Sequence, residues 1–219
     1  MTTLPRPLAV LIESAAATTI VAGVIGVVRQ WFEAQAVRRG DLTPASAAVE
    51  LPPRREPGPL GRRLAVWVPT PPRTPLGRLA AAAWAGPLTT IGTMLALLAG
   101  RRPRWDPCLQ CLIVRGMRGP SAAALRTVGA DANTIGQVVL SRRETPAATL
   151  LAHEAVHVRQ IERLGPLIVP LYAWLGAIYG YRDHPLERAA RLGARRSQLP
   201  SPSAAPLSSA TPPSADSLD

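Results

Sequence analysis

The chain contains no lysine, so all 25 of its basic residues are arginines, and with 24 prolines this is typical of a GC-rich genome. Part of the net charge of +11 therefore reflects codon usage. Phe and Tyr are also scarce, with one Phe and three Tyr. Proteins that bind nucleic acid usually carry aromatic stacking platforms or a known reading motif. The composition favours membrane lipid over nucleic acid as the partner of the positive charge.

Cysteine is nearly absent, and the two residues present form one CxxC, Cys108-Leu109-Gln110-Cys111. Such a motif can form half of a zinc site or a redox pair. No second CxxC or nearby histidine supplies further ligands, and the strand-to-helix context of thioredoxins is missing. Two reduced cysteines beside a strand are the favoured interpretation, and they do not indicate a compartment.

Two of the only three histidines lie in one HExxH motif, with His153, Glu154 and His157 at its defining positions. Residues four apart on a helix share a face, so both imidazoles can reach a single metal ion, and zinc suits that geometry. Glu154 is turned about 100° around the helix and can hold a water that the metal polarises. The alternative is two helix histidines with only structural roles.

The residues around the motif predict a helix with the motif near its middle. Thr145 is a candidate N-cap followed by Pro146 at the first helical position, and Gly165-Pro166 is a stop signal. A catalytic zinc needs three protein ligands, so another residue must complete the site. Pro185 predicts the start of a second helix and places Glu187 in its first turn, where a carboxylate also complements the helix dipole.

This combination resembles the gluzincin class of metallopeptidases, in which HExxH on one helix is completed by a Glu on a following helix. It is also similar to small bacterial membrane-associated proteins with an HE-x-x-HVRQ helix, a Gly-Pro break, an apolar stretch and a YRD-x-P-x-E-R-x-A segment. In this chain those parts are residues 153–160, 165–166 and 181–190. The resemblance covers about residues 125–192.

The resemblance implies that His153, His157 and Glu187 are metal ligands and that Glu154 is the general base. One position departs from the pattern, because His184 stands where a small polar cap such as Asn is expected. His184 can itself bind metal and is the alternative third ligand, and a Glu that merely favours a helix start is the remaining reading of Glu187.

An oxyanion partner is also expected, and Tyr181, Arg182 and His184 are the candidates in that neighbourhood. Upstream, residues 136–141 are rich in β-branched side chains and predict a short strand. In zincin folds such a strand lines the cleft, and an extended peptide can pair with its free edge. An ordinary core strand is equally compatible with these residues.

Two apolar stretches, residues 8–28 and 79–100, are about long enough to cross a bilayer of roughly 30 Å. Glu13 interrupts the first, and in the second Pro87 predicts that the firm helix begins only there. A buried or interfacial helix is the alternative for both. A third stretch, residues 166–179, is too short to span and predicts a helix beside the site, at the membrane interface or in the core. Arginines lie on both sides of the second stretch, within residues 29–78 and at positions 101, 102 and 104. The orientation of the chain in the membrane is therefore not fixed.

The expected fold is mainly α with a small β element, an α+β, minimal zincin-like arrangement with one or two membrane-associated helices. In chain order, we expect an apolar N-terminal helix (1–30), a Pro/Arg-rich linker (31–77), an apolar candidate transmembrane helix (78–100), a zincin-like metal-binding domain (101–196) and a disordered tail (197–219).

The sequence thus predicts a membrane-associated zinc metallopeptidase of the bacterial inner membrane that hydrolyses peptide or protein substrates with a zinc-activated water. The alternative is a non-catalytic membrane protein whose metal joins two helices, with His184 available as a fourth ligand. A third possibility is a basic nucleic-acid or lipid-binding module with an accidental HExxH. The sequence indicates neither the cleavage specificity nor the oligomeric state.

Overall fold

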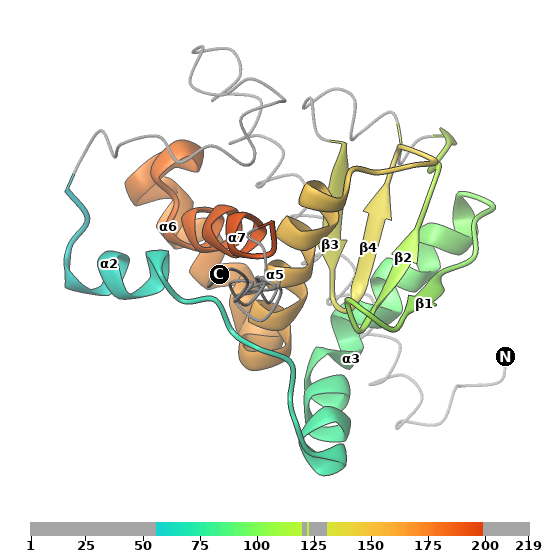
Figure 1. Ribbon diagram of the computed structural model, residues 1–219, viewed down its shortest axis with the longest axis horizontal. Coiled ribbons are helices and arrows are strands. Elements are labelled where there is room, and N and C mark those ends of the chain that lie inside the picture. The colour runs from blue at the N-terminus through green and yellow to red at the C-terminus, as the bar shows by residue number, and fades with distance from the viewer. Residues whose placement is uncertain (1–55, 120–121, 123–130, 199–219) are drawn as a thin grey trace, which may run out of the picture.

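The computed structural model describes residues 56–119, 122 and 131–198 (Figure 1). The elements in chain order are α2 (Pro59–Ala65), α3 (Pro75–Leu98), β1 (Arg104–Asp106), β2 (Cys111–Val114), β3 (Ala132–Ile135), β4 (Val138–Ser141), α5 (Ala148–Leu164), the 3₁₀ turn η2 (Gly165–Leu167), α6 (Ile168–Asp183) and α7 (Pro185–Arg196). This part of the chain is mainly helical with one small mixed sheet, as the sequence predicts. The expected N-terminal helix and residues 199–219 of the expected tail lie outside the described residues.

The four strands form a sheet in the order β1-β2-β4-β3. The central pair, β2 and β4, is parallel, and the two outer pairs are antiparallel. Gly136 and Gln137 form the two-residue turn between β3 and β4, and Gly136 has a φ of 64°. A glycine at the first central position is typical of a type II′ hairpin turn, because that position requires a positive φ.

The strand predicted over residues 136–141 begins later than expected, at Val138, because its first two residues form the hairpin turn. β4 is also an interior strand, paired with both β2 and β3. The sheet edge beside α5 therefore belongs to β3, which packs against that helix.

Two helices cover opposite faces of the sheet. Val138 and Leu140 of β4 pack in one cluster with Ala96 of α3, whereas Val139 packs in another with Leu151 and Val158 of α5. This alternation follows from the two-residue period of a strand. A third cluster joins α3, α5, α6 and α7 beside the sheet. α5, which carries His153 and His157, is therefore held between a sheet and a helical layer.

The helix in the second apolar stretch begins at Pro75, twelve residues before the predicted firm start at Pro87. Thr74 caps it by accepting a hydrogen bond from the Gly77 N–H at 3.1 Å, and Pro75 occupies the first helical position. Pro87 lies inside α3, on the side that faces solvent. Packing of the inner side of α3 against the sheet and α5 overrides the local break at this proline.

The helix boundaries near the motif differ from prediction at one end only. α5 begins at Ala148 with Ala147 as a cap that has no side-chain bond, so Thr145-Pro146 precedes the helix. Its end at Gly165, with a φ of 54°, agrees with the predicted stop. α7 begins at Pro185, as predicted.

Two helical stretches are long and apolar enough to cross a membrane, Pro75–Leu98 and Ala148–Asp183, although the core helix of a soluble protein passes the same test. The second stretch is divided by η2 into α5 and α6. Within the predicted linker, residues 59–65 form α2, which packs on α7. Leu64 and Trp67 anchor this segment to the helical core.

The hairpin turn is expected to be sensitive to any added side chain. A Cβ on Gly136 would lie 2.2 Å from the backbone nitrogen of Thr89 on α3, whereas a Cβ on Gly100 would meet nothing within 4 Å. Both residues have a positive φ, so both alanine variants carry a backbone strain of about 1–2 kcal/mol. We expect Gly136→Ala to lose about 1–3 kcal/mol more than Gly100→Ala in urea denaturation. Equal losses would contradict the close approach of α3 to the turn.

Candidate metal centre

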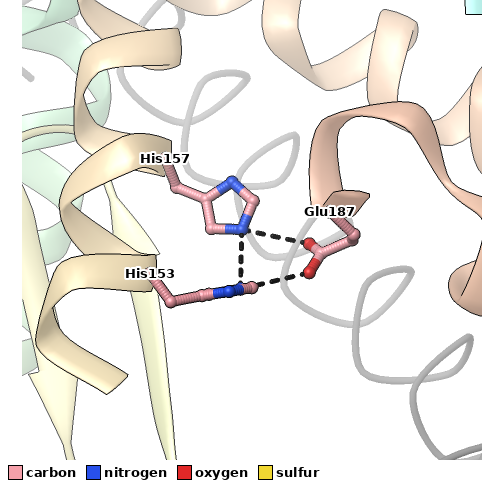
Figure 2. Close-up of side chains that lie close together, drawn as sticks. All are labelled: His153, His157 and Glu187. Carbon is pink, nitrogen blue, oxygen red and sulfur yellow. Dashed lines mark hydrogen bonds and ion pairs between the residues drawn. The ribbon is translucent and has the colours of Figure 1, made fainter. Parts of the chain in front are cut away.

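Three buried side chains from two helices converge on one point (Figure 2). His153 and His157 lie one turn apart on α5, and Glu187 comes from the first turn of α7. The His153 Nε2 atom lies 3.3 Å from Glu187 Oε2, and the His157 Nε2 atom lies 3.2 Å from Glu187 Oε1. The two Nε2 atoms are 3.2 Å apart. Packing of α5 against the start of α7 thus assembles the set expected from the sequence.

The spacing and chemistry of these atoms fit a zinc-sized ion. Tetrahedral zinc with bonds of about 2.0–2.1 Å places its ligand atoms about 3.3–3.4 Å apart, close to the observed separations. Two imidazoles with one carboxylate also favour zinc over magnesium or calcium, which take oxygen ligands. The group could therefore hold a metal ion through His153, His157 and Glu187.

Burial also favours a cation at this point. His153, His157 and Glu187 are only 4%, 3% and 0% exposed. Burial lowers the pKa of His153, although the neighbouring Glu187 opposes that shift, so its imidazole is neutral at pH 7. A neutral imidazole does not compensate a buried carboxylate, whereas a divalent cation between these side chains does.

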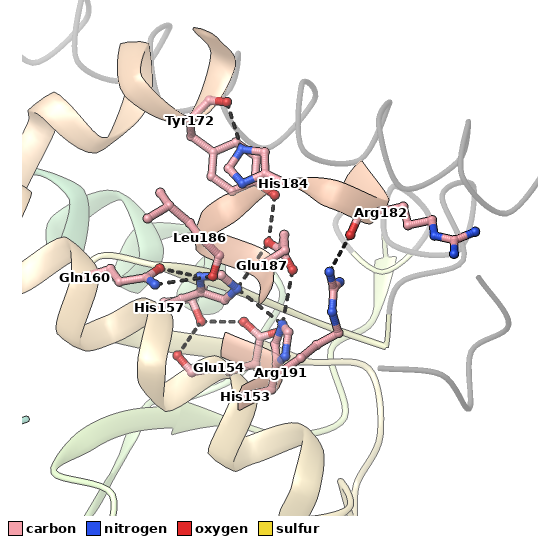
Figure 3. Close-up of polar contacts among 11 residues, drawn as sticks. His153, Glu154, His157, Gln160, Tyr172, Arg182, His184, Leu186, Glu187 and Arg191 are labelled. Atoms are coloured by element: carbon pink, nitrogen blue, oxygen red, sulfur yellow. Dashed lines mark hydrogen bonds and ion pairs between the residues drawn. The ribbon is translucent and has the colours of Figure 1, made fainter. Parts of the chain in front are cut away.

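A glutamine one turn after the motif fixes the tautomer of His157 (Figure 3). The Gln160 side-chain N–H donates to the Leu186 carbonyl at 3.3 Å, so its Oε1 faces the His157 Nδ1 at 2.9 Å. The proton of His157 must therefore sit on Nδ1, which leaves the Nε2 lone pair directed at the ligand cluster. This arrangement orients a metal ligand and links α5 to α7.

A tyrosine from α6 completes the surroundings of Glu187. The Tyr172 hydroxyl donates to Glu187 Oε1 at 2.7 Å, and Tyr172 is 5% exposed. The sequence placed Tyr172 only in an apolar helix beside the site. Its role was missed because neither its spacing nor its composition links it to Glu187, and only the fold of α6 against α7 brings them together.

Glu154 lies outside the three-ligand group, as a general base should. Its carboxylate accepts a hydrogen bond of 2.5 Å from the Thr134 hydroxyl, and Glu154 is 1% exposed. Thr134 belongs to the edge strand β3, so this bond joins the strand to the motif. No local pattern in the sequence indicates Thr134, because its contact with Glu154 depends on how β3 packs on α5.

His184, the alternative third ligand, is directed elsewhere. Its Nε2 lies 3.0 Å from the Tyr172 carbonyl, and its ring stacks on the Tyr172 ring with centroids 4.0 Å apart. Burial lowers the pKa of His184 to about 4. The structure therefore places His184 behind Tyr172 and outside the His153, His157 and Glu187 group.

The other two oxyanion candidates make main-chain contacts near the start of α7. The Tyr181 carbonyl accepts from the His184 N–H at 3.3 Å, and the Arg182 carbonyl accepts from the Arg191 guanidinium. Both side chains are partly exposed. These main-chain contacts position the turn between α6 and α7.

The CxxC loop is tied to the motif helix through a buried arginine. Arg159 donates to the carbonyls of Leu109 and Gln110 and pairs with Glu162 at 2.5 Å. Both cysteines are free, with Cys108 exposed and Cys111 buried. Burial raises the pKa of the Cys111 thiol to about 12, so it is a poor nucleophile at neutral pH. The hydrogen bonds from Arg159 give the CxxC loop a structural role, because they hold it against α5.

Comparison with known proteins found one match. A family model described as the eCIS core domain matches residues 113–165, from β2 to the end of α5. That segment covers about a quarter of the chain and includes His153, Glu154 and His157 but not Glu187. No curated protein and no solved structure matches this sequence.

The buried histidines predict a loss of stability in mild acid. The pKa of His184 is about 4 in the folded protein and that of His153 is also lowered, against about 6.5 in an unfolded chain. Below pH 6.5 the unfolded chain binds protons that the folded chain does not. The free energy of unfolding of the metal-free protein should therefore fall towards pH 4 by about 1.4 kcal/mol per pH unit from His184, and the lowered pKa of His153 acts in the same direction.

Urea denaturation at several pH values measures this slope. We expect the His184→Gln variant to show a smaller slope than the unmodified protein, whatever its stability at pH 7. An identical slope would contradict the burial of a neutral His184.

Proposed function

We propose that this protein is a membrane-associated zinc metallopeptidase of the gluzincin type. The observation that supports the proposal most is the meeting of His153 and His157 with Glu187, at distances suited to zinc, from a helix that also carries Glu154. When bound, zinc would polarise a peptide carbonyl and lower the pKa of a water towards 7.

The residues of the chain would then divide the remaining work. His153, His157 and Glu187 hold the ion, and Gln160 keeps His157 in the tautomer required for binding. Glu154 accepts a proton from the attacking water and passes it to the leaving amine. The Thr134 hydroxyl restrains the Glu154 carboxylate, which reduces the number of positions that the base can sample.

The edge strand β3 supports a peptide as the class of substrate. β3 is the outer strand of the described sheet, and its Thr134 touches the proposed base, but residues 132–134 are buried. An extended peptide could pair with this edge only after the groups that cover it had moved, and it would then run beside Glu154. The proposal thus moves the peptide-binding edge from β4, where the sequence placed it, to β3.

A structural metal site is the second candidate, and the burial of the ligands favours it. His153, His157 and Glu187 are each 4% exposed or less, which suits a metal that joins α5 to α7. A closed structural site needs four protein ligands, and His184 is engaged with Tyr172 instead. The two candidates therefore differ in what Glu154 does.

Metal content and hydrolysis together distinguish the candidates. We expect about one zinc per chain in the purified protein by inductively coupled plasma mass spectrometry, and its loss in His157→Ala and Glu187→Ala. Glu154→Gln should keep the zinc and lose at least about a hundredfold in hydrolysis of a fluorogenic peptide library. Glu144→Gln, at an exposed position, is the matched control.

A structural site predicts instead that Glu154→Gln changes nothing measurable, whereas His157→Ala unfolds the domain. Absence of zinc after purification with added zinc would contradict both candidates.

The hydrogen bond from Tyr172 should strengthen metal binding. Tyr172→Phe removes the donor to Glu187 while keeping the ring that stacks on His184, so zinc affinity should fall about 10–100-fold in a competition titration with a chelator. Tyr179→Phe is the control, because Tyr179 packs at the helical core beside Gly61. Equal affinities in the two variants would show that the Tyr172 hydroxyl does not act on the metal ligand.

A further inference from the structure

The solvent-facing side of α3 is an uninterrupted apolar surface. The exposed residues on this side, which we call the α3 stripe, are Leu76, Leu79, Ala80, Ala83, Pro87, Thr90, Met94, Leu97 and Leu98. At 100° per residue they fall within about 100° of the helical wheel. Met94 is 57% exposed and Leu98 is 84% exposed. Soluble monomers rarely leave so long an apolar surface facing water.

The one polar member of the stripe satisfies its donor inside the helix. The Thr90 hydroxyl donates to the Gly86 carbonyl at 3.0 Å. Between Leu76 and Leu98 the stripe extends about 33 Å and carries no charge. Transfer of this side of α3 to an apolar medium would therefore leave no charged group or free hydroxyl donor without a partner.

Arginines flank the α3 stripe at both ends. Arg73 and Arg78 are exposed near the start of α3, and Arg102 and Arg104 are exposed just after its end. No Asp or Glu occurs between Glu56 and Asp106. An apolar helical surface flanked by arginines matches the boundary between acyl chains and anionic phosphates in a membrane.

The opposite side of α3 excludes a membrane-spanning orientation. The Thr89 hydroxyl accepts from the Gln137 N–H at 3.0 Å, and the Gln137 side chain donates to Glu162 at 2.6 Å. Glu162 in turn pairs with Arg159. If α3 crossed a bilayer, the sheet and these charged groups packed behind it would have to enter the hydrocarbon, at a cost of several kcal/mol.

We infer that the α3 stripe docks the folded domain onto an anionic lipid surface, with α3 lying in the plane of the interface. Long arginine side chains at each end of the helix reach the phosphates while the apolar residues contact the acyl chains. A second copy of the chain is a poorer occupant, because antiparallel pairing of two stripes brings the arginines of one copy against those of the other. The inference refines the membrane association in the proposed function and does not depend on the metal site.

Environment-sensitive labels on the full-length chain test this docking surface. Cys108→Ser removes the exposed thiol, and the buried Cys111 remains unreactive. A nitrobenzoxadiazole label is then attached at Met94→Cys in the α3 stripe, or at Val66→Cys, an exposed apolar position directly after α2. Each labelled protein is mixed with phosphatidylcholine vesicles with or without phosphatidylglycerol.

The inference predicts that phosphatidylglycerol vesicles shift the emission of the label at position 94 to the blue. Spin-labelled lipids should also quench it, while the label at position 66 remains in water. Protein that sediments with vesicles but leaves the label at position 94 in water would overturn the inference, whatever anchors it. Shielding of that label without vesicles would also overturn it, because it would show that residues 8–28 or a second copy covers the stripe.

Neutral substitutions at the flanking arginines test their contribution to vesicle binding. Replacing Arg102 and Arg104 with Gln should weaken vesicle binding about tenfold or more, since each basic residue near an anionic surface contributes about 1 kcal/mol. Arg63→Gln with Arg196→Gln, at exposed positions of α2 and α7, is the matched control. Equal weakening in both pairs would contradict a specific role for the α3 ends and would indicate attraction by net charge alone.

Discussion

The contact between α5 and the first turn of α7 is the constraint on which the site depends. It places the Glu187 carboxylate within 3.3 Å of two imidazole nitrogens in a nearly dry interior. Because burial keeps His153 neutral, its imidazole does not balance that carboxylate, whereas a cation among the three side chains would. Tyr172 and Gln160 each add one hydrogen bond that orients a ligand.

The remaining elements hold α5 in place from several directions. The sheet packs on one side of it, and Thr134 of the edge strand reaches the proposed base. Arg159 connects the same helix to the β1–β2 loop, which accounts for the CxxC segment without metal or redox chemistry. α3 covers the other side of the sheet and leaves an apolar surface outward. The candidate metal centre and the proposed lipid-docking surface thus belong to one packed unit but use different sides of it.

The features that local sequence encodes were predictable. HExxH spacing placed His153 and His157 on one helical face, and Pro185 marked the helix that carries Glu187. α3 begins at Pro75 and not at Pro87, because Thr74 caps the helix and Pro75 occupies its first position, while Pro87 is accommodated inside it. Tyr172 and Thr134 were not predictable as site residues, because their contacts depend on tertiary packing between elements far apart in sequence.

The central claim is that one metal ion is held by two histidines and a glutamate. X-ray absorption at the zinc edge of the purified protein tests it most directly. The account predicts only nitrogen and oxygen neighbours at about 2.0–2.1 Å, with a contribution from two imidazole rings. Sulfur neighbours at about 2.3 Å would place the metal at the cysteines and contradict the account, as would a protein that takes up no zinc.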